Sequence, residues 1–172
     1  MFSEVTSADL SVQVIAQDNK ISATTLQISA LKTSNETNLP VLFQINGLIP
    51  GGFDVSSIRL KKDGELDFNY QLKSVKVNGD DNFCHSLNIK IMQDNKFIYQ
   101  GKIGDLDNNK TINGLGKDDW IFFVSLDDNN DQLKNQNCEF TFDFKTYRNS
   151  PDEIGGFSDE VRVTNYVSSG NW

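Results

Sequence analysis

Residues 46–72 read NGLIPGGFDVSSIRLKKDGELDFNYQL, a succession of turn, strand, tight turn and strand. The triplet Ile49-Pro50-Gly51 is typical of a turn, because proline fixes φ and glycine supplies a positive φ. The pair Asp63-Gly64 is a strong signal for a β-hairpin. Apolar residues then recur at every second position, the period of a half-buried strand: Leu66, Phe68, Tyr70 and Leu72. This stretch predicts an all-β domain.

The same alternation continues along the rest of the chain. It predicts strands over residues 41–46, 87–91, 96–103, 120–126, 138–145 and 159–167, with Asp94-Asn95 as a hairpin turn. Residues 21–32 fit a helical or a strand period, and Thr24-Thr25 favours the strand. Polar patches at 78–82, 105–109 and 127–131 are interpreted as hairpin loops. About ten short strands without a long helix predict one β-sandwich domain.

Length and charge restrict the class of protein further. A chain of 172 residues suggests a single domain, and its net charge is −8. Nucleic acids and anionic membranes both need a cationic surface, so neither is expected as a partner. The longest apolar runs are far shorter than the ~20 residues that span a bilayer. The start Met1-Phe2-Ser3-Glu4-Val5 is not a basic stretch followed by an apolar run, so no signal peptide is visible.

Residues 1–16 form a segment of their own, separate from a sandwich domain expected over 17–172. Apolar side chains share one face of a predicted strand here, which Glu4 and Thr6 interrupt: Phe2, Ala8, Leu10, Val12 and Val14. Such a strand can add to the open sheet edge of a neighbouring subunit, and a head-to-tail contact of this kind propagates into a filament. It can equally pair within its own subunit, and the residues leave both possibilities open.

Catalytic patterns are not found in the sequence. A zinc protease helix needs two histidines one turn apart, whereas this chain has only His85. Cys84 and His85 are neighbours, and neighbours on a strand point to opposite faces, so they make a poor nucleophile and base. No Gly-x-Ser-x-Gly motif is present. We therefore expect a protein that is not an enzyme.

Calcium is the one candidate cofactor. Asp127, Asn129 and Asp131 have the spacing of the first ligands in an EF-hand, but Gln132 and Cys138 occupy the positions of its glycine and its final glutamate. An EF-hand is therefore excluded. A looser calcium site remains a hypothesis for the acidic loops, built from Asp105, Asp107, Asp127, Asn129 and Asp131.

A sugar-stacking face is a second hypothesis for binding. It would use the aromatic residues Tyr99, Trp120, Tyr147, Tyr166 and Trp172. Trp120 lies on the apolar phase of its strand, which favours a place in the core.

The chain has two cysteines, Cys84 and Cys138, and their spacing is not that of a metal site. From the residues alone they are either free thiols or one disulfide. Cys138 lies on the apolar phase of its strand, so its sulfur is expected to point into the core.

Several short motifs give the chain a family resemblance. The turn Leu48-Ile49-Pro50-Gly51 is followed by a strand and by Asp63-Gly64-Glu65-Leu66-Asp67, and the chain begins Phe2-Ser3-Glu4 after Met1. Near the end, residues 155–160 read GGFSDE, and the chain finishes Asn171-Trp172. With the cysteine pair, these motifs resemble the TasA/camelysin family of secreted bacterial and archaeal surface and matrix proteins.

The resemblance implies a jelly-roll sandwich, a Cys84–Cys138 disulfide and secretion, with Met1 standing in place of a removed leader. It also implies filaments of the biofilm matrix or cell surface, in which residues 2–14 insert into the next subunit by donor-strand exchange. The partners would be copies of the same chain and other matrix or surface proteins. The alternative is a monomeric cell-surface module that binds calcium or a glycan through loops 105–109 and 127–131.

Overall fold

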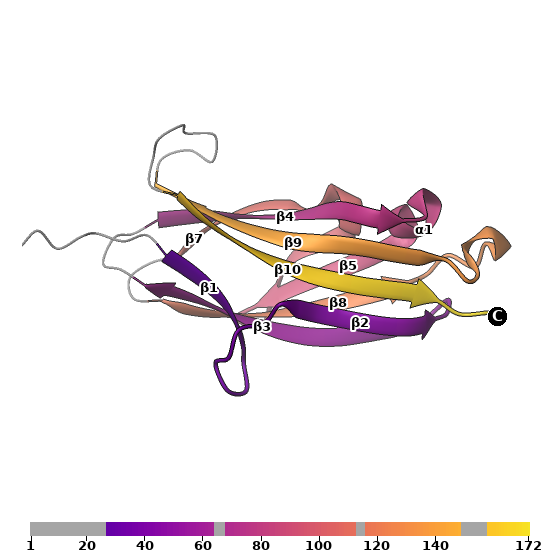
Figure 1. Ribbon diagram of the computed structural model, residues 1–172, viewed down its shortest axis with the longest axis horizontal. Helices are drawn as coiled ribbons and strands as arrows, with labels where there is room; N and C mark the ends of the chain where they lie inside the picture. The colour runs from indigo at the N-terminus through magenta and orange to yellow at the C-terminus, as the bar shows by residue number, and fades with distance from the viewer. Residues whose placement is uncertain (1–26, 64–67, 113–115, 149–157) are drawn as a thin grey trace, which may run out of the picture.

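Two five-stranded sheets pack face to face in the computed structural model, which describes residues 27–63, 68–112, 116–148 and 158–172. Sheet A has the order β1-β3-β8-β5-β6, and sheet B has the order β2-β10-β9-β4-β7. The strands of sheet A are β1 (Gln27–Lys32), β3 (Phe53–Asp63), β8 (Lys117–Leu126), β5 (Leu87–Gln93) and β6 (Lys96–Lys102). Those of sheet B are β2 (Val41–Leu48), β10 (Ser158–Ser169), β9 (Asn137–Tyr147), β4 (Phe68–Gly79) and β7 (Asp107–Ile112). The predicted all-β, jelly-roll-like sandwich is confirmed (Figure 1).

The core is aromatic, and it joins the two sheets. Trp120 on β8 is fully buried and lies 5.3 Å from the ring of Tyr70 on β4 and 6.1 Å from Phe144 on β9. The ring centres of Phe122 in sheet A and Phe142 in sheet B are 4.8 Å apart. Strict alternation along β8 and β9 places these rings on the inner faces, because successive side chains of a strand point to opposite sides. The predicted core position of Trp120 is confirmed.

The hairpin predicted at Asp63-Gly64 is wrong. β3 pairs with β1 and β8 in sheet A, whereas β4 pairs with β7 and β9 in sheet B. The chain therefore crosses between the sheets here, and residues 64–67 themselves lie outside the described residues. Leu60 and Leu72 face the same core from opposite sheets. Alternation looks the same whether the next strand lies beside its predecessor or across the core from it.

Two other predicted turns are confirmed. The Gly52 amide donates to the Ile49 carbonyl at 2.8 Å, and Gly51 has φ +79°, as a turn with proline and glycine at its centre requires. Asp94 and Asn95 have φ of 49° and 59° and join β5 to β6, the left-handed pair of a two-residue hairpin.

Two of the polar patches are not simple loops. Residues 81–86 form a short helix, α1 (Asp81–Ser86), where the sequence analysis expected a hairpin loop and the start of a strand. Asp80 caps α1 by accepting from the Phe83 amide at 2.8 Å, and Phe83 anchors the helix in the core. In the second patch, the 3₁₀ turn η1 (Ile103–Asp105) leads directly into β7 from Asp107. A second 3₁₀ turn, η2 (Asp131–Leu133), follows the third patch.

Gly79 joins β4 to α1, and we expect its replacement to be costly. Its φ is +103°, and a Cβ at this position would collide with the Asn137 backbone carbonyl. Gly79→Ala should lower the free energy of unfolding by about 2 kcal/mol or more, since it combines backbone strain with a clash. Gly47→Ala is the matched control. Gly47 has φ +74° with open space around it, so only the strain of about 1 kcal/mol applies.

Urea denaturation of both variants, followed by circular dichroism, measures the difference. Equal losses for Gly79→Ala and Gly47→Ala would contradict the predicted clash.

One side of the sandwich is formed by two successive strands, β1 in sheet A and β2 in sheet B. β1 pairs with the second half of β3 in sheet A, and the chain then crosses to sheet B, where β2 pairs in parallel with the second half of β10. Figure 1 shows β1 and β2 following one another along this side, with the loop between them projecting outward. Each covers half of the sandwich length, so the first half of β3, Phe53–Ser57, has β8 as its only paired neighbour among the described strands.

An ion cluster ties the loop between β1 and β2 to sheet A. Arg59 donates two hydrogen bonds of 2.6 Å to Asp119 and one of 3.0 Å to Glu36 in the loop. The hydrogen bonds from Arg59 hold the pKa of Asp119 below its usual value. Lys117 is the largest cause of the lowered pKa of Glu36. The cluster thereby fixes where the chain leaves sheet A.

Candidate functional site

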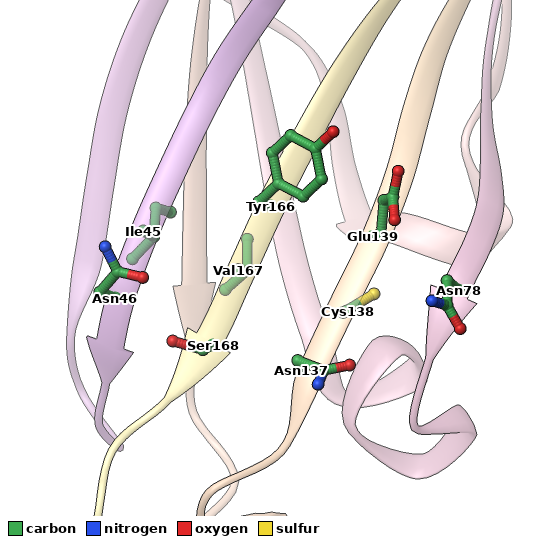
Figure 2. A pocket seen from close by; sticks show the side chains of 9 residues that line it. All are labelled: Ile45, Asn46, Asn78, Asn137, Cys138, Glu139, Tyr166, Val167 and Ser168. Carbon is green, nitrogen blue, oxygen red and sulfur yellow. The ribbon is translucent and has the colours of Figure 1, made fainter.

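The outer face of sheet B carries a hollow of about 300 Å³ near the end where β2 and β10 finish (Figure 2). Strands β2, β10, β9 and β4 each contribute to its lining. The lining residues are Ile45, Asn46, Asn78, Asn137, Cys138, Glu139, Tyr166, Val167 and Ser168. It is a shallow site made of amides, one carboxylate, hydroxyls and a small apolar floor.

Strand register explains why these polar groups meet. Tyr166 is directly opposite Glu139 on β9, and Glu139 is directly opposite Asn78 on β4. Directly opposite residues of paired strands point to the same face, so this row lies on the outer side of sheet B. Figure 2 shows the Tyr166 ring and the Glu139 carboxylate on neighbouring strands, rising from the same side.

Two of the polar side chains of the hollow have partners among the described residues and four do not: Asn78 accepts from the Gly79 amide at 2.8 Å, and Ser168 accepts from the Gly47 amide at 3.3 Å. Within the described part of the chain, no hydrogen bond or ion pair engages the side chains of Tyr166, Glu139, Asn46 or Asn137. Further along the same face, Arg162 pairs with Asp143 at 3.2 Å and with Glu160 at 2.8 Å. The hollow therefore offers donors and acceptors to a ligand.

A disulfide lies beneath one side of the hollow. The Cys84 and Cys138 sulfurs are 2.07 Å apart, and the bond joins α1 to β9 across 54 residues. Cys138 is buried, as its place on the apolar phase predicted. The pairing that the resemblance implied is thus present in the structure.

A second candidate is the first half of β3, which among the described strands is paired only on its β8 side. The Lys62 backbone amide donates to the Gly116 carbonyl, and the Leu126 backbone amide donates to the Gly52 carbonyl. The even-numbered residues of β3 therefore direct their backbone amides and carbonyls toward β8. Odd-numbered residues in an antiparallel ladder direct their backbone groups to the other side. The Val55 amide follows this rule and is bonded by the Asp54 carboxylate at 2.8 Å instead of by a strand. Phe53–Ser57 is thus an open half-edge of sheet A, meaning that no described strand pairs with it on this side, and at its end the Ser57 hydroxyl lies 2.8 Å from that of Thr33 in the loop after β1.

Exposed apolar side chains lie on the half-edge and further across the same sheet, as far as β6 at the opposite edge. Phe53 is 68% exposed and Val55 is 43% exposed, both on the outer face of sheet A. Phe97 on β6 is 53% exposed, and its ring lies 6.2 Å from that of Phe123 on β8. An apolar surface rimmed by polar groups is typical of a protein interaction site.

The residues proposed for calcium do not form one cluster. Asp107 accepts from Gln71 at 2.6 Å and pairs with Lys73, whereas Asp127 accepts from Asn88 at 2.9 Å. Asp131 begins η2 and pairs with Lys134. Across the described ranges, no three His, Cys, Asp or Glu side chains gather as metal ligands. The structure therefore does not bring Asp105, Asp107, Asp127, Asn129 and Asp131 together, and calcium binding stays a prediction from sequence.

Cys84 and His85 are neighbours on α1 rather than on a strand, and the sulfur of Cys84 is bonded to Cys138. The assembly residues Phe2, Ala8, Leu10, Val12 and Val14 lie outside the described residues, as does the predicted boundary at residue 16.

The aromatic residues do not form the single sugar-stacking face that was considered. Trp120 and Tyr147 are buried, and the Tyr99 hydroxyl donates to the Lys102 carbonyl at 2.9 Å. Trp172 is partly buried, with Lys134 Nζ 5.9 Å from its ring centre. Of these five residues, only Tyr166 is an exposed side chain on a sheet face.

Several solved structures are similar to this chain at low sequence identity. The ASH/PapD-like domain of human CEP192 superposes with a TM-score of 0.50 at 9% identity, covering 96% of this chain and 99% of that one. The N-terminal domain of PorA has a TM-score of 0.44 at 8% identity, and the match covers 84% of this chain and 99% of that one. CfaE, the adhesive subunit of the CFA/I fimbria of enterotoxigenic Escherichia coli, has a TM-score of 0.42 at 9% identity, and the match covers 77% of this chain and 48% of that one. No protein-family model and no curated protein matches the chain.

Sequence reasoning missed the hollow, because its lining comes from four strands that are distant along the chain. No local motif marks it. The clue that was available is the pair Asn137 and Glu139, which lie on the polar phase of the most regular strand.

In the described ranges, no helix has the length and apolar character needed to cross a membrane.

Proposed function

We propose that this chain is a secreted structural protein, a subunit of extracellular or biofilm-matrix filaments that assemble by strand addition, as in the TasA/camelysin family that its motifs resemble. The observation that carries the proposal is the open half-edge Phe53–Ser57, whose Val55 amide has only the neighbouring Asp54 side chain as partner. An extended segment from another subunit can bond to such an edge through its main chain. The proposal assigns no catalytic step to the chain.

The arrangement of the strands suits a head-to-tail contact. β1 begins near one end of the sandwich, and β10 finishes near the other, where the chain ends (Figure 1). β1 covers Ile58–Asp63 of β3, so the open half-edge lies in the half of the sandwich away from the start of β1. A segment preceding β1 in one subunit would therefore meet the half-edge of the next subunit, and this contact does not close on itself.

The sequence before β1 supplies a suitable donor. Residues 2–14 alternate and contain no proline, with Phe2, Ala8, Leu10, Val12 and Val14 on one face. The exposed side chains of Phe53 and Val55 offer apolar contacts beside the half-edge. The disulfide supports an oxidising, extracellular location, because such bonds are rare in the cytosol.

Blocking the half-edge tests this assignment. Val55→Pro removes an amide that makes no ladder bond in the subunit, and edge strands tolerate proline at such positions. We expect negative-stain electron microscopy to show filaments for the parent chain beginning at Phe2 and for its Val55→Ala variant. Val55→Pro and a variant lacking residues 2–16 should stay monomeric, with melting temperatures near that of the parent chain.

The alanine variant is the matched control, because it shortens the same side chain but keeps the amide. Filaments of Val55→Pro would exclude β3 as the acceptor edge. Monomers from every preparation, including the chain beginning at Phe2, would overturn the assembly proposal as a whole.

A further inference from the structure

We propose that the hollow on the outer face of sheet B is a carbohydrate site, which takes a neutral or amino-sugar unit of a polysaccharide. This goes beyond assembly, since the hollow lies on sheet B whereas the half-edge belongs to sheet A. It also differs from the two glycan hypotheses drawn from the sequence. The hollow does not use loops 105–109 and 127–131, and of the five aromatic residues considered for sugar stacking it includes only Tyr166.

The lining has the chemistry that a sugar ring requires. A sugar presents hydroxyls around its edge and C–H groups on its faces. Amides, carboxylates and phenols supply both donors and acceptors for hydroxyls, and here they come from Asn46, Asn137, Glu139 and Tyr166. The Tyr166 ring, 43% exposed, offers an aromatic face whose negative quadrupole attracts C–H groups.

Several of these groups have no hydrogen-bond partner among the described residues, and this favours a polar ligand over an apolar one. The Glu139 carboxylate and the Asn137 amide make no hydrogen bond to any described residue, although both lie on a strand whose other outward carboxylate, Asp143, is ion-paired. An apolar ligand would remove water from these groups without replacing its hydrogen bonds, and this costs free energy. A ligand rich in hydroxyls would replace them.

Size and charge narrow the class of sugar. At about 300 Å³ the hollow is at the lower limit of small-molecule pockets, which range from about 300 to 1,000 Å³, so it suits one or two sugar units. Glu139 is the only charged residue in the lining, and the chain carries a net charge of −8. Acidic sugars would be repelled, whereas neutral and amino sugars would not.

Saturation-transfer NMR on the full chain tests the site with four probes: maltotriose, cellotriose, tri-N-acetylchitotriose and trigalacturonate. We expect transfer to at least one of the three neutral trisaccharides and none to trigalacturonate. Tyr166→Ala should weaken binding of the responsive sugar at least about tenfold, a change equivalent to 1.4 kcal/mol. Tyr166→Phe keeps the ring and should retain most of the affinity, and Glu139→Ala should weaken it severalfold.

Phe97→Ala is the matched control, because Phe97 is an exposed aromatic residue on the opposite sheet and its loss should leave binding unchanged. Thermal melting of each variant verifies folding. Absence of transfer to all three neutral sugars, equal binding of trigalacturonate, or an unchanged affinity in Tyr166→Ala would each overturn the proposal. Repeating the titration with Val55→Pro separates the site from assembly, since sugar binding should persist in that variant whether or not the parent chain forms filaments.

Discussion

Trp120→Ala is expected to lower the free energy of unfolding by about 3 to 5 kcal/mol, the usual cost of deleting a large buried aromatic side chain. Trp120 is fully buried at the centre of the core, with ring contacts to Tyr70, Phe122 and Phe144 from both sheets. Its removal leaves a cavity that neighbouring strands, held in register by two ladders each, cannot close.

Urea denaturation followed by far-ultraviolet circular dichroism measures this loss without depending on tryptophan fluorescence. Phe53→Ala is the control, because a side chain that is 68% exposed contributes little to the core and should change stability by no more than about 0.5 kcal/mol. Losses of similar size for the two variants would contradict the central role of Trp120.

Removing the disulfide is expected to cost about 4 kcal/mol, because the bond closes a loop of 54 residues and restricts the unfolded chain. The double variant Cys84→Ala/Cys138→Ala is preferable to serine, since both sites are buried and a hydroxyl there would need a partner. Urea midpoints of the parent chain with and without reductant, compared with the double variant, give the size of the effect.

The double variant is also the control for the reductant, which should destabilise the parent chain and leave the variant unchanged. Thiol titration of the unreduced native protein should find no free thiol. Detection of two free thiols would contradict the disulfide.

The predicted turns and strands show where local sequence suffices. Alternation identified β8 and β9 and placed Trp120 and Cys138 in the core. A strand with one buried face has an apolar residue at every second position, so the sequence alone shows which side chains are buried. Pro50-Gly51 and Asp94-Asn95 gave correct turns, since their φ preferences act within a few residues. α1 was missed, although Asp80 is a typical N-cap residue and Asp81 is an acidic residue in the first turn, both of which are readable signals of a helix start.

The alternation of apolar residues could not predict which strands pair with one another. Asp63-Gly64 has hairpin chemistry, yet the chain crosses between sheets there, because Leu60 and Leu72 gain the same burial from either arrangement. The acidic patches have suitable calcium ligands, yet the fold directs Asp107 to Lys73 and Asp127 to Asn88. Which polar groups meet depends on register, and register is a property of two strands together.

The sequence by itself determined an all-β sandwich, the core positions of Trp120 and Cys138, the turns at Pro50-Gly51 and Asp94-Asn95, and a negative net charge. Each of these follows from the period, conformational preference or charge of residues close together in the chain. Only the tertiary structure decided that β1 and β2 share one side and leave Phe53–Ser57 open, and that Tyr166, Glu139 and Asn137 meet around a hollow. Both features depend on which strands become neighbours, and that choice is made by packing of the whole core rather than by any local segment.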